Sequence, residues 1–104
     1  MAAESELEKN CKTLVELGLK GKLLKVQLIA RNGWPDREML IPGCPTVYIE
    51  MKSPGKPLRS QQKQWRDWLT DNGFIHWKID SWGEFQTRVR ELVEQREEAN
   101  APPL

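Results

Sequence analysis

Residues 33–52 read GWPDREMLIPGCPTVYIEMK. Two runs rich in β-forming residues, 37–41 and 46–52, flank a turn built from Pro42, Gly43, Cys44 and Pro45. Alternating or apolar runs joined by a short Pro- and Gly-containing segment predict a β-hairpin. Three charged residues stand in this otherwise apolar pattern, and their placement points to chemistry.

The three charges are Asp36, Glu50 and Lys52. Alternate residues of a strand share a face, so Glu50 and Lys52 are neighbours on one surface, about 7 Å apart. A turn centred on Gly43 would place Asp36 opposite Glu50, and a turn centred on Cys44 would place it opposite Lys52. A centre between these two would turn Asp36 to the wrong face. Either of the first two registers brings two carboxylates and an ammonium within side-chain reach.

Two crowded carboxylates repel each other unless a cation lies between them. Mg²⁺ takes carboxylate, carbonyl and water oxygens, and the backbone carbonyl of Met51 can supply one more oxygen between Glu50 and Lys52. A lysine beside a metal can orient or deprotonate an attacking water, or neutralise charge that develops on a phosphate. The hairpin therefore predicts a site for phosphodiester hydrolysis. The plain alternative is an exposed strand face with one ion pair between strands.

The rest of the chain predicts an α/β sheet domain with the order α-β-β-β-α-β-α. Apolar residues at helical spacing indicate the helices, and Ser81 with Glu84 has the spacing of a capping box at the start of the last one. Outside the hairpin we expect a helix over 4–17, a strand over 23–30, a helix over 60–72, a strand over 74–79 and a helix that begins after Ser81.

Composition limits the class of protein. The length of 104 residues suits one domain, which we expect over 1–98 with a frayed tail over 99–104. A net charge of +1, from 16 Lys+Arg and 15 Asp+Glu, excludes a protein that is basic overall, so nucleic-acid binding would need local clustering. Cys11 and Cys44 are far apart and belong to no Cys/His cluster, which argues against a disulfide framework and a zinc site. We expect neither a secretory signal nor a membrane span, and a cytoplasmic location.

The tryptophan count is high, at five. Trp65 and Trp68 lie on one helical stripe with Leu69, and we expect both in the core. Trp34 lies in the loop before Asp36, where it can pack under the site or stack on a base. The chain has no GxxxxGK[ST] phosphate loop, so we expect no nucleotide cofactor.

Together, several stretches resemble the VRR-NUC family, a branch of the PD-(D/E)xK nuclease superfamily: GWPDREMLIPG, YIEMKSPGKPL, SQQKQW and NGFIHWKIDS. The resemblance covers about residues 4–85. It implies a restriction-endonuclease-like αβββαβ core, here with an added C-terminal helix. Members of the family that stand alone, including phage and bacterial ones, are Mg²⁺- or Mn²⁺-dependent, structure-selective DNA endonucleases. Some act as homodimers on four-way (Holliday) junctions.

The resemblance also implies roles for individual residues. Its acidic residue in the first helix matches Glu4, and its glutamine in the helix after the hairpin falls on Gln62, with Gln61 and Gln64 as alternatives. The implied catalytic residues are Asp36, Glu50, Lys52 and Gln62. The implied metal ligands are Asp36, Glu50, the backbone oxygen of Met51, and Glu4.

DNA is the partner that these features favour. Lys56, Arg59 and Lys63 lie over the loop and helix start that follow the hairpin, where they can contact a DNA backbone with salt-dependent affinity. Branched or flapped DNA in a bacterial or phage-infected cytosol is the expected substrate, and a homodimer would supply the two active sites that paired incisions need. The alternative is a nucleic-acid-binding module that kept the fold and lost cleavage. Clustered carboxylates argue against it, since binding a polyanion does not need them.

Overall fold

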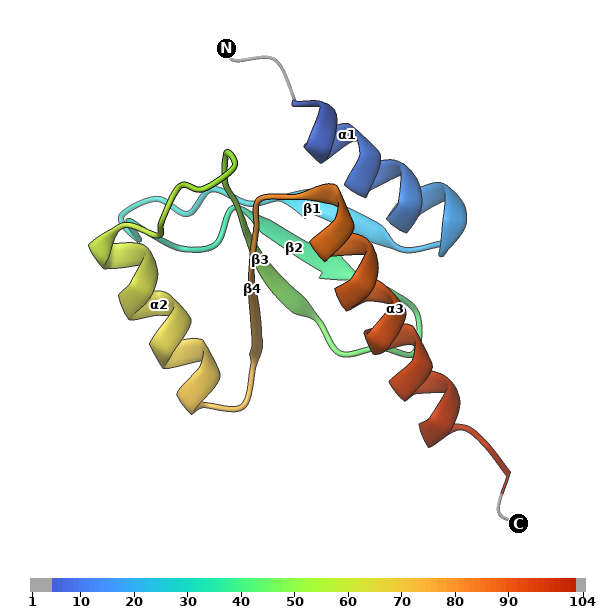
Figure 1. Ribbon diagram of the computed structural model, residues 1–104. Helices are drawn as coiled ribbons and strands as arrows, with labels where there is room; N and C mark the ends of the chain where they lie inside the picture. The colour runs from blue at the N-terminus through green and yellow to red at the C-terminus, as the bar shows by residue number, and fades with distance from the viewer. Residues whose placement is uncertain (1–4, 103–104) are drawn as a thin grey trace.

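The computed structural model describes residues 5–102 and contains a four-stranded sheet with helices on both faces (Figure 1). In chain order the elements are α1 (Glu6–Thr13), the π-helical turn η1 (Leu14–Gly18), β1 (Lys22–Lys25), β2 (Arg37–Leu40), β3 (Val47–Met51), α2 (Ser60–Asp71), β4 (Ile75–Ile79) and α3 (Trp82–Ala99). The strands lie in the order β1-β2-β3-β4. β4 is parallel to β3, whereas β1, β2 and β3 are antiparallel to one another. The predicted αβββαβ order with an added C-terminal helix is confirmed.

The β2–β3 hairpin has one of the two registers that would bring the charges together. Arg37 lies opposite Ile49, and Gly43 stands at the centre of the turn with a φ of 79°. A positive φ is strained for residues with a side chain, so glycine suits this position. Continued by one residue, the same register places Asp36 opposite Glu50.

The first helix begins at a polar cap and ends in a widened turn. The backbone N–H of Glu8 donates to the Ser5 hydroxyl oxygen over 3.1 Å. In η1 the N–H of Leu19 donates to the carbonyl of Leu14, five residues earlier, which is the π-helical hydrogen bond. The predicted start of this helix, Glu4, lies outside the described residues.

The strand predicted over 23–30 is wrong in its length, because β1 ends at Lys25. One further N–H, that of Val26, donates to the carbonyl of Asp36 over 2.9 Å. β2 begins only after Asp36, so within the described sheet the residues beyond Val26 have no strand to pair with. They form a loop in which Ile29 is 95% exposed.

The other strands and α2 agree with their predicted boundaries to within one residue. The last helix starts as its capping residues predict, with the N–H of Glu84 donating to the Ser81 hydroxyl oxygen over 3.2 Å. It continues to Ala99, one residue into the stretch that the sequence assigns to the tail. Among residues 5–102, no helix combines the length and the apolar character needed to cross a membrane.

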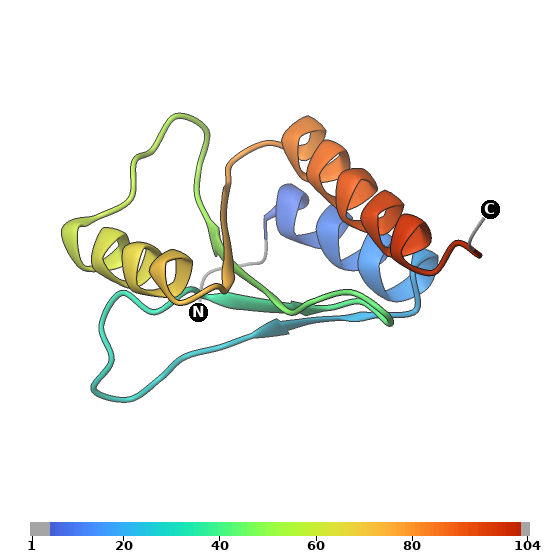
Figure 2. The ribbon, with the colours of Figure 1, turned by 90° about the horizontal axis from the view of Figure 1, so that it is seen from below.

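The main core fills the space between the sheet and the pair formed by α1 and α3. Figure 2 shows α1 and α3 side by side on one side of β4, with α2 on the other side. The core is built from the inward-facing residues of these elements: Cys11, Val15, Met39, Val47, Ile49, Ile79, Phe85, Val89 and Leu92. Burying each large side chain contributes about 1.5–3 kcal/mol, and together these side chains fix the position of β3, the strand that carries Glu50.

A second, smaller apolar layer lies between the sheet and α2. We call it the aromatic cluster, and its members are Trp34, Tyr48, Trp65, Trp68 and Phe74. Their rings form a closed circuit in which each ring meets the next with centroids 4.9 to 6.2 Å apart. The prediction that Trp68 belongs to the core is wrong, because it is 50% exposed. Leu69 and Gln62 occupy the stripe of α2 that faces the sheet, which leaves Trp68 at the edge, stacked on Phe74 with an interplanar angle of 12°.

Candidate active site

The site starts at Asp36, the residue just before β2. One carboxylate oxygen of Asp36, Oδ1, accepts a hydrogen bond from the backbone N–H of Met51 over 3.1 Å. Its backbone carbonyl accepts from the N–H of Val26, so the main chain of Asp36 is held by β1 as well. These two contacts fix the carboxylate at the end of the hairpin, next to Glu50.

The pKa of Glu50 is shifted by its burial and by the nearby Asp36. Glu50 is only 6% exposed, and its pKa is raised from 4.5 to about 7, first because burial removes water from the carboxylate and second because Asp36 lies nearby. Lys52, Arg59 and Arg37 oppose this rise. The pKa of Asp36 is raised as well, mainly by burial. A cation between the two carboxylates would stabilise their charged forms and so lower the pKa of both carboxyls.

Lys52 follows directly after β3. Its backbone N–H donates to the carbonyl of Ile79 over 2.9 Å, which extends the pairing of β3 with β4 by one residue. By strand alternation its side chain lies on the same face as Glu50, and its charge lowers the pKa of that carboxyl. The structure thus brings together the three charges that the hairpin pattern singled out. Of the two possible registers, it has the one in which Asp36 lies opposite Glu50 rather than opposite Lys52.

Gln62 lies in the first turn of α2 and is buried. It is 4% exposed, whereas Gln61 and Gln64 are exposed, so among these three glutamines Gln62 is the one that faces the sheet. Its side-chain oxygen, Oε1, accepts a hydrogen bond from the backbone N–H of Arg59 over 2.8 Å. This contact satisfies one of the N–H groups left open at a helix start, and it leaves the Gln62 amide group as a donor.

A close backbone contact fixes α2 against the loop that carries Asp36. Gly33 has a φ of 85°, and a Cβ atom there would lie 2.6 Å from the carbonyl carbon of Gln61. The indole N–H of Trp65 donates to the carbonyl of Asn32 over 3.0 Å. Only a residue without a side chain fits between the loop and α2, so Gly33 sets the distance between Asp36 and the helix of Gln62.

Sequence reasoning missed the ion pair of Arg37 with Glu8. The guanidinium nitrogen Nη2 of Arg37 lies 3.0 Å from Glu8 Oε2, and Nη1 lies 3.4 Å from Asp36 Oδ2. Arg37 alternates with Met39 on the face that packs against α1, so a charged residue at an inward position was the available signal. Glu4, the acidic residue that the resemblance assigns to the site, lies outside the described residues.

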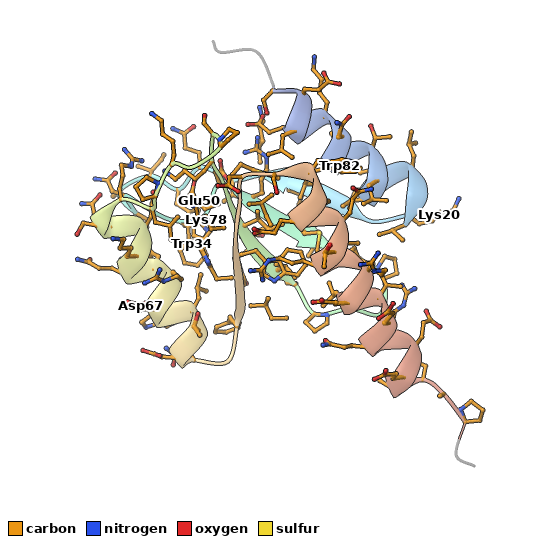
Figure 3. All side chains as sticks on the ribbon, viewed as in Figure 1. Lys20, Trp34, Glu50, Asp67, Lys78 and Trp82 are labelled. Atoms are coloured by element: carbon orange, nitrogen blue, oxygen red, sulfur yellow. The ribbon has the colours of Figure 1, made fainter. Side chains whose placement is uncertain are left out.

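β4 and the residue that follows it add two further charged residues that the sequence did not single out, Lys78 and Asp80. Lys78 pairs with Glu50 in the parallel register, and the two lie near each other in Figure 3. The Lys78 ammonium is 3.6 Å from Asp80 Oδ2, which also accepts from the backbone N–H of Gly55 over 3.1 Å. No sequence pattern indicated this neighbour, because the sequence alone does not show which residue of β4 pairs with Glu50 in the parallel register.

Beside these charges the surface is hollowed. The hollow has a volume of about 510 Å³ and lies between the start of α1, the ends of β3 and β4, and the start of α3. Glu8, Met51, Lys52, Asp80 and Trp82 are among the residues that line it. It gives a ligand access to the end of β3 on the side that faces α1.

The three predicted DNA-binding residues, Lys56, Arg59 and Lys63, are all exposed. Lys56 lies in a turn, in which its backbone N–H donates to the carbonyl of Ser53 over 3.1 Å. Arg59 lies close enough to Glu50 to lower its pKa. The structure therefore places one cation, Arg59, near Glu50, with further exposed cations in the preceding turn and on α2.

The donor set fits a hard divalent cation. Within residues 5–102, no three side chains of the His, Cys, Asp and Glu types converge on one point. What converges is a pair, Asp36 and Glu50, beside the backbone of Met51. Two carboxylates and a carbonyl suit Mg²⁺ or Mn²⁺, because Mg²⁺ binds through one or two carboxylates and keeps several waters for a substrate to displace.

Comparison with known proteins identifies the fold. A solved structure described as a VRR_NUC domain matches with a TM-score of 0.70, over 83% of this chain and 97% of that chain, at 16% sequence identity. No family model matches the sequence, and no curated protein matches it either. The predicted fold class, an αβββαβ core with an added C-terminal helix, is therefore confirmed, and the chain shares its fold with a VRR_NUC domain.

Proposed function

We propose that this protein is a divalent-metal-dependent endonuclease that hydrolyses phosphodiester bonds in DNA. One observation carries the proposal: the hairpin register sets Asp36 opposite Glu50, with Lys52 on the same face as Glu50. A protein that only bound DNA would gain nothing from two neighbouring carboxylates facing a polyanion. The match to a VRR_NUC domain agrees with this activity at the level of the fold.

In this proposal Asp36, Glu50 and the backbone oxygen of Met51 hold Mg²⁺ or Mn²⁺. When bound, the ion supplies Lewis acidity at the scissile phosphate. The two carboxylates already repel each other in a site with little water, which favours occupation by a cation. Glu4 is proposed to support these ligands.

Lys52 and Gln62 act on the attacking water and on the phosphate. The Lys52 ammonium is a three-proton donor without acceptor capacity, so it can orient a water molecule or stabilise negative charge on a phosphate oxygen. The Gln62 oxygen is committed to the N–H of Arg59, and its amide group therefore acts as the donor toward the water or the phosphate.

Lys56, Arg59 and Lys63 are proposed to contact DNA phosphates, which would make affinity fall with added salt. Branched or flapped DNA, including four-way junctions, is the proposed substrate, and the cytoplasm the proposed location. A homodimer would place two sites on one junction. Sedimentation that shows only monomer at micromolar concentration, with and without junction DNA, would remove the dimer from the proposal.

A cleavage assay tests the activity. Labelled four-way-junction, flap and linear duplex DNA would be incubated with Mg²⁺, Mn²⁺ or EDTA, using wild type, Asp36→Asn and Lys52→Ala. Lys22→Ala, an exposed lysine on β1, is the matched control. Metal-dependent cutting that Asp36→Asn and Lys52→Ala lose and Lys22→Ala keeps supports the proposal. Binding without cutting in either metal would favour the nucleic-acid-binding module.

A further inference from the structure

We propose that the buried guanidinium of Arg37 keeps the Glu8 carboxylate in an ion pair and thereby limits the metal site to a single divalent ion. The inference rests on the proposed metal-dependent activity and assigns Arg37 as a positioning residue. It concerns the side of Asp36 where Arg37 and Glu8 lie, and where the carboxylates of Asp36 and Glu8 could otherwise serve as ligands of a second ion.

The Arg37 guanidinium joins α1 to the start of β2. Its Nη2 lies 3.0 Å from Glu8 Oε2, and its Nη1 donates to the backbone carbonyl of Asp36 over 3.0 Å while lying 3.4 Å from Asp36 Oδ2. One cation thus contacts the carboxylates of two residues from different elements. The planar fork of an arginine suits this, because its nitrogen donors point in fixed directions.

Burial holds the guanidinium in place. The Arg37 side chain is 7% exposed, and that of Glu8 is 22% exposed. Arg37 shares its face with Met39, which is fully buried in the core, so the stem of the side chain cannot swing out without opening the contact between α1 and the sheet. An arginine keeps its charge at every pH at which the protein is folded. The positive charge beside Asp36 is therefore permanent.

A fixed positive charge at this position has two effects on metal binding. It pairs with Glu8, so the carboxylate of Glu8 points at Arg37 and does not join Asp36 and Glu50. It also repels a second divalent ion on its own side of Asp36. The side between Asp36 and Glu50 stays open, and one ion binds there.

Metal stoichiometry tests the inference without reference to cleavage. Isothermal calorimetry and electron paramagnetic resonance with Mn²⁺ would be run on wild type, Glu8→Gln and Asp36→Asn. We expect one ion per wild-type chain, one ion for Glu8→Gln with its Kd within about threefold of wild type, and loss of binding for Asp36→Asn. Two ions in wild type, or a tenfold weaker Kd in Glu8→Gln, would overturn the inference. Wild type that binds no ion would instead overturn the proposed function.

Changing Arg37 itself provides the second arm. Arg37→Met keeps an unbranched apolar stem and removes the charge, and we expect the number of bound Mn²⁺ ions to rise from one to two. Arg37→Lys keeps the charge and is expected to bind one ion, like wild type. A folded Arg37→Met variant that still binds one ion would count against the inference. If Arg37→Met fails to fold, the Glu8→Gln result decides alone.

Discussion

The Asp36 carboxylate accepts its hydrogen bond from the backbone N–H of Met51, fifteen residues further along the chain. This 3.1 Å contact joins the residue before β2 to the end of β3. It orients Asp36 along the edge of the sheet, beside Glu50, rather than out into solvent. The backbone of the central strand thus positions one carboxylate, and the pleat of the same strand positions the other.

The electrostatic cost of the carboxylate pair predicts a stabilising substitution. The pKa of Glu50 is about 7 in the folded protein and 4.5 ordinarily, so between these pH values the unfolded chain releases a proton that the folded chain keeps. In EDTA, wild-type stability should therefore fall as pH rises from about 4.5 to 7 and level off above it. Glu50→Gln removes this cost. At pH 8 we expect its free energy of unfolding to exceed that of wild type by about 1–3 kcal/mol, so that it unfolds at a higher urea concentration.

The measurement is urea unfolding at pH 5 and pH 8, with Glu94→Gln as the control. Glu94 lies exposed on α3, so the same change of chemistry there should leave stability nearly unaltered at both pH values. A Glu50→Gln variant that is less stable than wild type at pH 8 would show that the carboxylate is stabilised by its surroundings, contrary to the burial and repulsion described here.

Metal binding should raise the melting temperature. An ion that binds only the folded state stabilises it by about 2.7 kcal/mol at a concentration one hundred times Kd, which corresponds to a rise of roughly 10 °C or more for a domain of this size. Thermal unfolding with increasing Mg²⁺ or Mn²⁺ measures it. Asp36→Asn should show no such rise, and an equal rise in wild type and in Asp36→Asn would place the bound ion elsewhere.

Two glycines with a positive φ allow the effect of steric crowding to be measured apart from the effect of backbone conformation. Gly33 and Gly55 both have a positive φ, of 85° and 77°, but only Gly33 faces another backbone, that of Gln61. Alanine at either position carries the strain of a positive φ, whereas only Gly33→Ala also forces the loop away from α2. Chemical unfolding should find Gly33→Ala clearly less stable than Gly55→Ala. Equal losses would mean that the loop can shift without cost.

The two cysteines should react at very different rates. Burial, with the nearby charge of Glu8 as a second cause, raises the pKa of Cys11 to about 12, and the side chain is fully buried. Its thiolate is therefore almost absent at neutral pH. Cys44 is partly exposed. A disulfide reagent at pH 8 should label one thiol quickly and the second only on unfolding, with Cys44→Ser removing the fast phase. Rapid labelling of Cys44→Ser would contradict the packing of Cys11.

The hairpin could be predicted because its information is local. Alternation fixes which residues share a face, and the short turn leaves only a few registers, of which the sequence could not choose one. The choice falls on the turn centred on Gly43, whose φ of 79° is natural for glycine but not for Cys44. The start of α3 was predictable for the same reason, because the capping bond of Ser81 with Glu84 spans only three residues.

The features that escaped prediction depend on partners far away in the chain. The run over 23–30 has the composition of a strand, but its length is limited by β2, which begins at Arg37. Trp68 is apolar, yet its position on α2 depends on which stripe of that helix meets the sheet. The ion pair of Arg37 with Glu8 joins α1 to β2, and no short-range pattern reports a contact of that kind.

The continuity of the hairpin has a consequence for how the protein folds. The stretch 36–52 carries both carboxylates and closes through contacts that are short-range in sequence, whereas β4 joins β3 only after the chain has passed through α2. Contacts of short sequence separation form at low entropic cost, so we expect the hairpin to assemble before the parallel pair. The repulsion between Asp36 and Glu50 would then oppose an early step. We therefore expect divalent ions to accelerate refolding as well as to slow unfolding.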